Sequence, residues 1–482
     1  MRPELFIGGR WRAGRGEPFA SHDPATGAEV WRGAGADAQD VAEAMAAARA
    51  AFPGWARTPR DTRIALARRF GEIVKARAQD FAETISRETG KVLWDSLGEA
   101  ATVSGKVELS IRAQQERAGD RKDDAPFGAL TLTHRPLGVM AVFGPFNFPA
   151  HLPNGHIVPA LLAGDVVIFK PSELTPGVAA LMVACWEEAG LPAGVLNLVQ
   201  GGRETGAALL AQEGLNGVLF TGSAQTGLHI HRQFAGRPDV ILALEMGGNN
   251  PLIAHAPADP AAAANLIAHS AFVTSGQRCS CARRLIVPDD AFGRDVIEAA
   301  RALTQQIAVG AWTDRPEPFM GPLVRARAAD AALAFEADLV ARGGKHILPL
   351  ARDGAFVRPG MIDVTGVDAP DEELFGPLLQ VRRVRDLDAA VHAANDTRYG
   401  LAGGLICDDP AVWARVREEL RAGVLNWNRP TTGASGAAPF GGPGLSGSLR
   451  PSAYYAADYV AYPVASQVAD AARAIPAAGL PS

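Results

Sequence analysis

The order of apolar and polar positions divides the chain into a helical N-terminal part and two parts in which strands and helices alternate. After short strands and turns over 1–35, residues 38–118 repeat with helical periodicity. From 136 onward short apolar runs alternate with helical segments, and a second block of this kind runs over 252–425. This alternation predicts an α/β fold with two doubly wound parallel-sheet domains, an arrangement typical of dinucleotide binding. In the first block we expect strands at 138–143, 165–169, 195–199 and 217–220, with helices at 176–189 and 203–212.

Two segments stand outside these blocks. Residues 119–126 are charged and rich in turn formers, whereas 128–134 alternate like an exposed strand. Near the C-terminus, 454–464 is a β-prone run that predicts a late strand. An unpaired strand edge tends to associate with another strand, so we expect this run to have a partner.

Composition and charge narrow the class of protein. A chain of 482 residues with 48% hydrophobic and 21% charged residues is typical of a soluble globular protein of two or three domains. Its net charge of -5 argues against a broad nucleic-acid surface. The longest apolar region, 137–169, is interrupted by Gly, Pro, Asn and His, and residues 1–9 lack a signal-peptide core. We therefore expect a cytoplasmic protein with neither nucleic acid nor membrane as partner.

The chain has four cysteines, at 185, 279, 281 and 407, whose spacing fits neither a disulfide framework nor a metal site. Free thiols suit a reducing cytosol, and no metal is expected. Cys279 stands out because it follows a Ser-Gly-Gln turn between an expected helix and the strand-like run 285–288. Taken alone, a thiol presented by such a turn is a nucleophile, a redox sensor or an inert residue.

A loop that follows the expected strand 217–220 and opens a helix carries two glycines. Its residues are Gly222, Ser223, Ala224, Gln225, Thr226 and Gly227. Glycines permit close backbone approach, and the free N–H groups of a helix N-terminus suit a phosphate. The G-x-G-x-x-G fingerprint is absent, so an ordinary strand-to-helix turn is an equal alternative.

Lys170 directly follows the expected strand 165–169, and Glu173 lies three residues further on. Ligands of parallel sheets gather at the carboxyl ends of the strands, where a lysine and an acid can hydrogen-bond a ribose diol. A carboxylate there would repel a 2′-phosphate, which favours NAD over NADP. The alternative is a solvated charge pair.

Two polar residues stand in apolar surroundings. Asn147 lies in a loop stiffened by glycine and proline, and a rigid amide N–H there would stabilise an oxyanion by about 2.7–4 kcal/mol. Glu245 ends an apolar strand before two glycines, and apolar neighbours raise the pKa of a carboxyl group toward values at which it activates water. The alternatives are a turn-capping Asn and a salt-bridged Glu.

Two further loops give weaker signals. The turn 371–377 carries Glu373 and Phe375, a polar group and an aromatic platform that would suit a ribose and a nicotinamide ring. The glycine-rich loop 439–447 either lines a cleft or is a linker.

Taken in order, these motifs resemble those of the aldehyde dehydrogenase superfamily over nearly the whole chain. They are Asn-Phe-Pro, Lys-Pro-Ser-Glu, Phe-Thr-Gly-Ser, Leu-Glu-Met-Gly-Gly, Gly-Gln-Arg-Cys and Glu-Leu-Phe-Gly-Pro, with the family's spacing. The resemblance implies an NAD-binding domain of residues 1–118 and 136–247 and a catalytic domain of residues 248–447. It also implies that 119–135 and 452–482 form a small β oligomerisation arm, which pairs with a neighbouring subunit in a homodimer or homotetramer.

The same resemblance implies a role for each matching residue. Cys279 attacks the small-molecule aldehyde substrate, Asn147 and the Cys279 backbone N–H form the oxyanion hole, and Glu245 is the general base. Lys170 and Glu173 hold the adenosine ribose of NAD, residues 222–227 lie by its pyrophosphate, Glu373 holds the nicotinamide ribose, and Phe375 lies beside the ring. Thr274 departs from the family pattern, since many relatives have Asn there.

Several segments narrow the resemblance to members that oxidise N-succinylglutamate 5-semialdehyde in bacterial arginine catabolism. They are 151–156, 199–206, 245–251, 277–284, 426–430 and 450–459. This substrate carries two carboxylates, which arginine binds in a bidentate manner. The candidates are Arg278, Arg283, Arg429 and Arg450, although a structural salt bridge is the commoner role of any one arginine.

Three alternatives stay open. One is an aldehyde dehydrogenase for another acidic aldehyde, such as glutamate or succinate semialdehyde. A CoA-acylating relative is disfavoured by Glu245, which is present to activate water. A non-catalytic protein on the same fold is disfavoured by the intact set of Cys279, Glu245 and Asn147.

Overall fold

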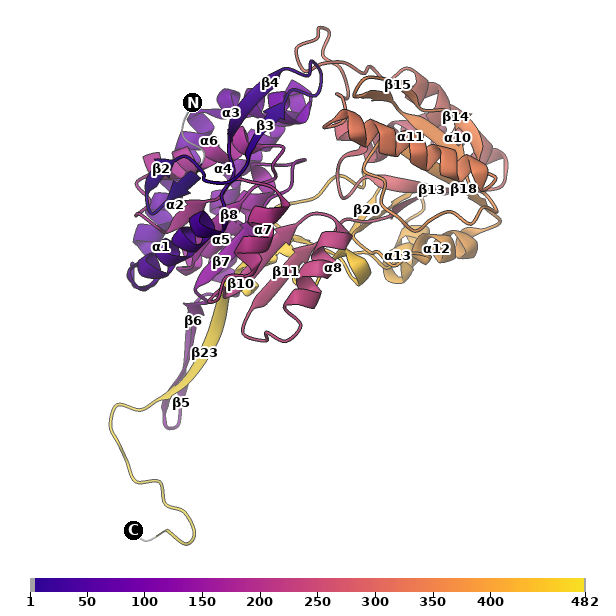
Figure 1. Cartoon of the computed structure of the whole chain (residues 1–482). Coiled ribbons are helices and arrows are strands. Elements are labelled where there is room, and N and C mark those ends of the chain that lie inside the picture. Colours follow the sequence, from indigo (N-terminus) through magenta and orange to yellow (C-terminus); the bar gives the residue numbers. More distant parts are fainter. Residues whose placement is uncertain (1–4, 481–482) are drawn as a thin grey trace.

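The computed structural model describes residues 5–480 and has two α/β domains, with a β arm that projects from one of them (Figure 1). The ends of the expected NAD-binding domain and arm, 1–4 and 481–482, lie outside the described residues. The chain opens with strands β1 Leu5–Ile7, β2 Arg10–Arg12, β3 Pro18–His22 and β4 Glu29–Ala34. Helices α1 Ala38–Ala56, α2 Arg60–Ala76, α3 Ala78–Thr89 and α4 Leu93–Arg117 follow, in the region expected to be helical.

The first domain is built on a seven-stranded sheet with the order β11-β10-β7-β8-β9-β1-β2. Its parallel strands are β7 Val139–Phe143, β8 Val166–Lys170, β9 Leu196–Leu198, β10 Gly217–Thr221 and β11 Ile241–Glu245. The linking helices are α5 His151–Ala163, α6 Pro176–Glu188, α7 Arg203–Leu210 and α8 Ala224–Gln233. Strands β7 and β8 are buried throughout, which explains their continuous apolar runs. The expected alternation is confirmed, and the edge strands β1 and β2 run antiparallel.

The second domain repeats this plan with the strand order β14-β17-β18-β13-β12-β19-β20. Its parallel strands are β12 Asn250–Ala254, β13 Ala282–Pro288, β17 Gly360–Asp363, β18 Leu378–Val384, β19 Ala402–Ile406 and β20 Val424–Trp427. The edge strand β14 Lys345–Leu348 is antiparallel. Helices α9 Pro260–Phe272, α10 Ala291–Gln305, α11 Ala326–Ala341, α12 Leu387–Asn395 and α13 Pro410–Glu419 complete the domain. The predicted class, two doubly wound parallel-sheet domains, is confirmed.

The arm is a three-stranded antiparallel sheet that extends away from both domains (Figure 1). Strand β23 Ala461–Val468 pairs along its length with β6 Gly128–Pro136, so the tail strand has a partner as expected. It begins later than predicted, because Tyr454–Asp458 forms a 3-10 helix, η3, that packs on α4. Strand β5 Arg121–Ala125 pairs with the other edge of β6, where we predicted only turns. Its charged side chains are almost all exposed, so apolar alternation gave no signal of the strand.

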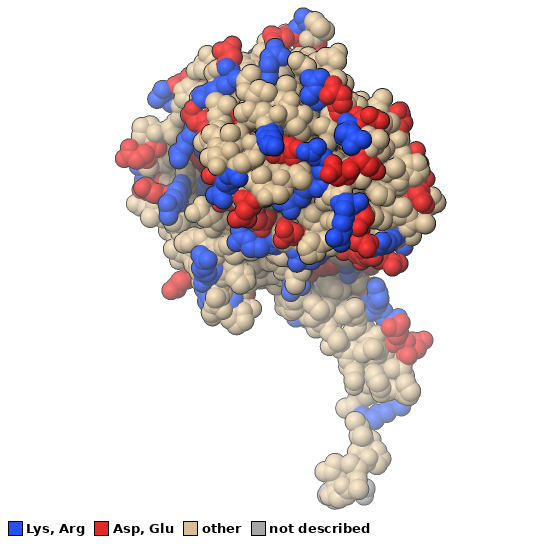
Figure 2. Space-filling view, turned by 90° about the vertical axis from the view of Figure 1, so that its right-hand side faces the viewer, with Lys and Arg blue, Asp and Glu red and all other residues tan. Residues whose placement is uncertain are grey.

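Shorter elements complete the structure. They are β15 Ala351–Asp353, β16 Phe356–Arg358, β21 Pro439–Phe440, β22 Ser452–Ala453 and the 3-10 helices η1 Val273–Gly276 and η2 Gly444–Ser446. Figure 2 shows that positive and negative side chains are interspersed over the exposed face of the second domain. Among residues 5–480, no helix combines the length and the apolar character needed to cross a membrane.

Candidate active site

The expected site residues converge on one cavity of about 820 Å³. It lies at the carboxyl ends of β7, β8, β10 and β11, and residues of the second domain close its other side. The expected residues that line it are Asn147, Lys170, Glu173, Gly222, Ser223, Gln225, Thr226, Glu245, Cys279, Glu373 and Phe375. Ala224 and Gly227 belong to the same loop but do not line it. Arg203 and His229, which the sequence did not single out, line the cavity from α7 and α8.

The turn that presents Cys279 has an unusual backbone. Helix α9 ends at Phe272, and the next residues include Thr274, Ser275 and Gly276 with φ of 55°, 58° and 72°. Such left-handed backbone is costly for residues other than glycine, so it needs support from its surroundings. Ser275 Oγ donates to the Gly321 carbonyl at 2.6 Å, and Arg283 Nη1 donates to the Gly276 carbonyl at 2.6 Å.

The thiol of Cys279 differs from the other three. Cys185, Cys281 and Cys407 are buried in the protein, whereas Cys279 is partly exposed to the cavity. Burial of its sulfur and the nearby charges of Glu373 and Glu245 raise the pKa of Cys279 well above its ordinary value. The resting side chain is therefore a thiol at neutral pH, and a base must remove its proton before it attacks a carbonyl carbon.

Asn147 is fixed beside this turn. Its Nδ2 donates a hydrogen bond of 2.9 Å to the Gln277 carbonyl, two residues before Cys279. Its backbone carbonyl accepts a hydrogen bond from Lys91 Nζ at 3.3 Å. The side chain is buried and lines the cavity, so the second Nδ2 hydrogen is held in a defined direction.

Glu245 ends β11 and is 6% exposed. Its Oε1 accepts a hydrogen bond from the Ser452 backbone at 3.3 Å, and its Oε2 is buried with no hydrogen-bond partner among the described residues. Burial raises the pKa of Glu245 well above its ordinary value. No ion pair to it occurs within the described chain, so the salt-bridge alternative is not what the structure has. A carboxyl group of this kind is suited to exchange protons with a thiol or a water.

The loop 439–447 packs directly on this carboxyl group, which excludes the linker interpretation. A Cβ placed on Gly441 would lie 2.9 Å from Glu245 Oε1, and the Ser446 carbonyl accepts a hydrogen bond of 2.9 Å from the Met246 backbone. Glycine is required at this approach because a side chain would collide with the acid.

The dinucleotide side of the cavity is formed by the loop 222–227 and by the end of β8. Ser223 caps α8 by accepting a hydrogen bond from the Thr226 backbone, and Gly227 lets the helix pack on Met246. Lys170 is buried, its Nζ donates to the Pro171 carbonyl at 2.9 Å, and burial lowers its pKa. Glu173 is exposed and forms no direct ion pair with Lys170, although its charge opposes the lowering of the Lys170 pKa.

Glu373 and Phe375 close the other end of this space. A Cβ on Gly247 would lie 2.0 Å from Glu373 Oε2, so the acid is seated directly over that glycine. Glu373 Oε1 is buried and accepts no hydrogen bond, but it lies 3.7 Å from Arg283 Nη2; burial raises the pKa of Glu373 to about 7, and the charge of Arg283 opposes this shift. Phe375 contacts Phe146 edge-on with ring centroids 5.9 Å apart. A carboxylate oxygen that accepts no hydrogen bond, beside an aromatic ring, fits a ribose hydroxyl next to a nicotinamide, so the cavity suits a nicotinamide dinucleotide.

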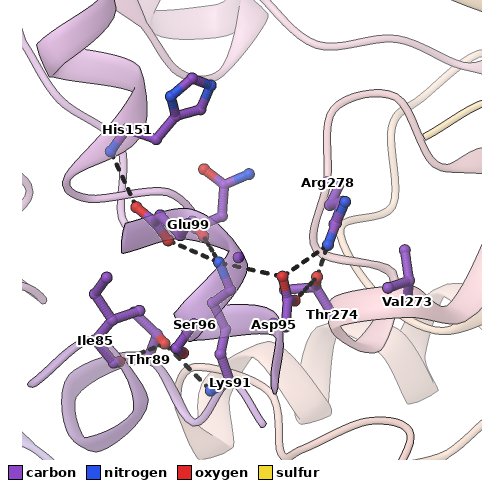
Figure 3. A network of polar contacts seen from close by, with 12 residues as sticks. Ile85, Thr89, Lys91, Asp95, Ser96, Glu99, His151, Val273, Thr274 and Arg278 are labelled. Carbon is purple, nitrogen blue, oxygen red and sulfur yellow. Dashed lines mark hydrogen bonds and ion pairs between the residues drawn. The ribbon is translucent and has the colours of Figure 1, made fainter. Parts of the chain in front are cut away.

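A network of buried charges supports the nucleophile turn from α4 (Figure 3). Arg278 Nη2 lies 2.9 Å from Asp95, Arg278 Nε donates to Thr274 Oγ1 at 2.8 Å, and that hydroxyl donates to Asp95 at 2.6 Å. Burial raises the pKa of Asp95, but the charges of Lys91 and Arg278 outweigh burial and lower it overall. Thr274, the departure from the family pattern, thus connects Arg278 to Asp95 by hydrogen bonds.

The same network reaches the loop of Asn147. Lys91 Nζ lies 2.7 Å from Glu99 Oε2, and Glu99 Oε1 accepts backbone hydrogen bonds from Ala150 and His151, each of 3.0 Å. Sequence reasoning missed Lys91, Asp95 and Glu99, because charged side chains usually face solvent.

The four candidate arginines have different surroundings. Arg283 is 1% exposed and holds backbone carbonyls of the nucleophile turn, so its interpretation as a substrate ligand is wrong. Arg429 and Arg450 are exposed, and none of the four candidate arginines lines the cavity that contains Cys279. Arg278 is engaged with Asp95 and Thr274, but its Nη1 has no hydrogen bond to any described residue.

This fold and this cavity are those of a dehydrogenase, and comparison with known proteins gives the family. The family model described as "Aldehyde dehydrogenase family" matches residues 11–462, and the chain belongs to this family. It is 60% identical over 473 residues to N-succinylglutamate 5-semialdehyde dehydrogenase 2 of Caulobacter vibrioides, covering 97% of this chain and 96% of that one. It is 54% identical over 467 residues to N-succinylglutamate 5-semialdehyde dehydrogenase of Paraburkholderia xenovorans, covering 96% of each.

Solved structures agree with the fold. HpcC from Thermus thermophilus superimposes with a TM-score of 0.93 at 29% identity, covering 99% of this chain and 95% of that one. Aldehyde dehydrogenase of Mycobacterium tuberculosis in complex with NAD+ gives 0.90 at 28% identity, covering 96% and 97%. NADP-dependent glyceraldehyde-3-phosphate dehydrogenase of Bacillus halodurans in complex with NADP gives 0.89 at 25% identity, covering 97% and 99%. The chain is therefore an oxidoreductase that uses a nicotinamide cofactor.

Proposed function

We propose that this enzyme oxidises N-succinylglutamate 5-semialdehyde to N-succinylglutamate with NAD, in the cytoplasmic catabolism of arginine. The observation that carries the chemistry is the convergence of Cys279, Glu245 and Asn147 on one cavity. The identity of 60% and 54% to relatives named for this substrate supports the substrate.

The order of events follows from the protonation states of the site. The ionised form of Glu245 accepts the proton of Cys279, and the thiolate sulfur adds to the aldehyde carbon to form a thiohemiacetal. The free Nδ2 hydrogen of Asn147 and the Cys279 backbone N–H stabilise its oxygen. Bound NAD supplies the hydride acceptor, after which Cys279 carries a thioester. Glu245 gives the first proton to solvent and then takes a proton from water; the resulting hydroxide adds to the thioester, and Cys279 leaves as a thiolate as the acid is released.

The preference for NAD over NADP is assigned to Glu173. Its carboxylate is exposed, lines the cavity next to Lys170 and is the negative group that a 2′-phosphate would meet. Replacement Glu173→Gln is expected to raise kcat/KM for NADP while NAD turnover is retained. An unchanged NADP/NAD ratio would remove this assignment.

Substrate carboxylates need cationic partners, and among Arg278, Arg429 and Arg450 we assign this role first to Arg278. It precedes the nucleophile and keeps Nη1 available beyond its pair with Asp95. Unchanged KM for the dicarboxylic aldehyde in Arg→Met variants of all three residues would contradict an arginine contact.

The arm supports a homodimer or homotetramer. It exposes large apolar side chains, among them Leu130, Tyr462 and Val468, and β5 leaves one strand edge uncovered by any described residue. In the space-filling view much of the projecting part is tan, with a few positive and negative groups on it (Figure 2). Light scattering of the eluted protein that gave a monomer mass would contradict this assembly.

The substrate proposal is tested by steady-state kinetics with three aldehydes. We expect the highest kcat/KM for N-succinylglutamate 5-semialdehyde and lower values for glutamate semialdehyde and succinate semialdehyde, with NAD as cofactor. A higher value for either smaller aldehyde would replace the proposed substrate and leave the aldehyde dehydrogenase chemistry intact.

A further inference from the structure

Lys106 on α4 is a buried lysine without a partner. The chain has six lysines: Lys75, Lys122 and Lys345 are exposed, while the buried Lys91 and Lys170 bind a carboxylate or a carbonyl oxygen. Lys106 is also buried, 2% exposed, yet its ammonium group has neither a hydrogen bond nor an ion pair to any described residue. Burying the side chain of a lysine is costly, and the Lys106 Nζ is not among the fully enclosed atoms without a partner, so it reaches a space that solvent or a ligand can enter.

The charge of Lys106 acts on His151 of helix α5, whose next residue, Leu152, lines the cavity that contains Cys279. Burial and then the charge of Lys106 lower the pKa of His151 to about 3, and Lys91 and Arg278 add to the shift. His151 meets the Phe148 ring edge-on at 6.2 Å, and the same ring lies 3.8 Å from Lys91 Nζ and 5.0 Å from the Arg278 guanidinium. Figure 3 shows the His151 ring pointing away from Glu99, which binds only its backbone. Lys106 therefore belongs to the group of cations around Phe148 and His151.

The cations around Phe148 and His151 outnumber the carboxylates paired with them by one. Lys91 is neutralised by Glu99 and Arg278 by Asp95, whereas no carboxylate of the described chain is paired with Lys106. Burial lowers the pKa of Lys106 to about 8, so the ammonium form still prevails at neutral pH. The group as a whole is therefore complementary to one further anion.

The space beside Lys106 is open to such an anion. Gly155 on α5 is partly exposed, and a Cβ placed there would meet only Lys106 Cε, at 3.9 Å. On the same helix, His151 Nδ1 and Asn154 Oδ1 are buried without hydrogen-bond partners, and Asn154 Nδ2 donates to the Val103 carbonyl one turn before Lys106. A donor and two further polar atoms are thus left unsatisfied where α4 faces α5, as in a site made for a polar ligand.

We propose that Lys106 binds a carboxylate of the substrate and is the residue that selects an anionic aldehyde. The inference rests on the proposed function, because it requires an acidic semialdehyde as substrate. Arg278 is already paired with the Asp95 carboxylate, whereas Lys106 is paired with no carboxylate of the described chain. A substrate carboxylate would therefore not compete with a protein carboxylate for the Lys106 ammonium group.

The test compares Lys106→Met with wild type on charged and uncharged aldehydes. For N-succinylglutamate 5-semialdehyde we expect KM to rise about 10- to 100-fold, the loss of one hydrogen bond to a charged group, with kcat retained. For butanal, which has no carboxylate, kcat and KM are expected to stay at wild-type values. Lys106→Arg should recover most of the affinity, and Lys345→Met, the same change at an exposed lysine, should have no effect.

The outcomes separate this inference from the proposed substrate. Equal changes of KM for the charged aldehyde and for butanal, or no change for either, would overturn the role of Lys106. A wild-type enzyme that fails to oxidise N-succinylglutamate 5-semialdehyde would overturn the proposed substrate, and succinate semialdehyde against butanal then tests Lys106 independently. Thermal unfolding of each variant shows whether an altered KM comes from a folded protein, and titration of folded protein with N-succinylglutamate measures carboxylate binding without turnover.

Discussion

The side-chain amide of Asn147 donates a hydrogen bond of 2.9 Å to the backbone carbonyl of Gln277, 130 residues away in the sequence. This bond joins the loop after β7 to the turn that carries the nucleophile. It uses one of the two Nδ2 hydrogens and fixes the direction of the other. The oxyanion donor is therefore oriented before substrate arrives, which is the condition under which such a donor is effective.

Replacement Asn147→Ala should lower kcat for aldehyde oxidation by about 100- to 1,000-fold, because the oriented donor is lost. Cofactor binding, followed by fluorescence of bound NADH, is expected to remain. A decrease confined to KM, with kcat unchanged, would contradict an oxyanion role.

Two cysteines only two positions apart should respond oppositely to replacement. Cys279→Ala removes the sulfur that faces the cavity, so NADH production should be lost. Cys281 Sγ is fully buried and contacts the Val273 carbonyl at 3.8 Å, so Cys281→Ala should keep turnover with a small loss of stability. Equal turnover of wild type and Cys279→Ala would exclude the covalent mechanism.

Glu245→Gln should separate the two halves of the reaction. The variant lacks the base for hydrolysis, so we expect steady-state turnover to fall about 100- to 10,000-fold. Rapid mixing should show at most one NADH per subunit before turnover stops. The amount is below one if Glu245 also assists the deprotonation of the Cys279 thiol. Steady turnover at the wild-type rate would show that another group activates the water.

Sequence reasoning found those parts of the site whose chemistry is local. Cys279 after its glycine turn, Glu245 at a strand end and Asn147 in a stiff loop each carry a signal within a few residues, and the structure places all three on one cavity. The parallel sheets were predictable for the same reason, because buried strands are continuous apolar runs.

What sequence reasoning missed depends on contacts between distant residues. Asp95 and Glu99 resemble solvated charges on a helix, and their pairing with Arg278 and Lys91 becomes visible only when α4 is packed against the nucleophile turn. Strand β5 lacks apolar alternation and is defined by pairing with β6. The sequence suggested Arg283 as a substrate ligand, but in the structure its guanidinium donates hydrogen bonds to the backbone carbonyls of Gly276 and Arg278.

Gly276→Ala should disrupt the nucleophile turn. The residue has φ of 72°, and an added Cβ would lie 2.2 Å from the Gly376 carbonyl oxygen, which is part of the backbone. Gly343→Ala is the matched control, since φ there is 106° and no atom lies within 4 Å of the added Cβ. A left-handed residue other than glycine costs about 1–2 kcal/mol, so the control should lose about that much and Gly276→Ala clearly more, together with activity. Equal melting temperatures and activities for the two variants would contradict the proposed clash.

The buried carboxyl group of Glu245 should make the stability of the protein depend on pH. Because its pKa is raised in the folded state, the folded protein binds the proton more tightly than the unfolded chain. Its contribution to the free energy of unfolding is therefore fully present below the ordinary pKa of Glu and is lost as the pH rises through the raised value. Each unit of the shift corresponds to about 1.4 kcal/mol.

Glu245→Gln removes this titration, so the variant should gain melting temperature relative to wild type as the pH increases from 4 toward 8. The measurement is thermal unfolding of both proteins across that range, with Glu418→Gln, an exposed acid, as the control whose difference from wild type stays flat. A difference for Glu245→Gln that is constant with pH, or that shrinks as the pH rises, would show that folding does not raise the pKa of this carboxyl group. Stability gained by the variant at neutral pH, together with its lost turnover, would mean that the wild-type fold tolerates a destabilising acid because the reaction requires a base at that position.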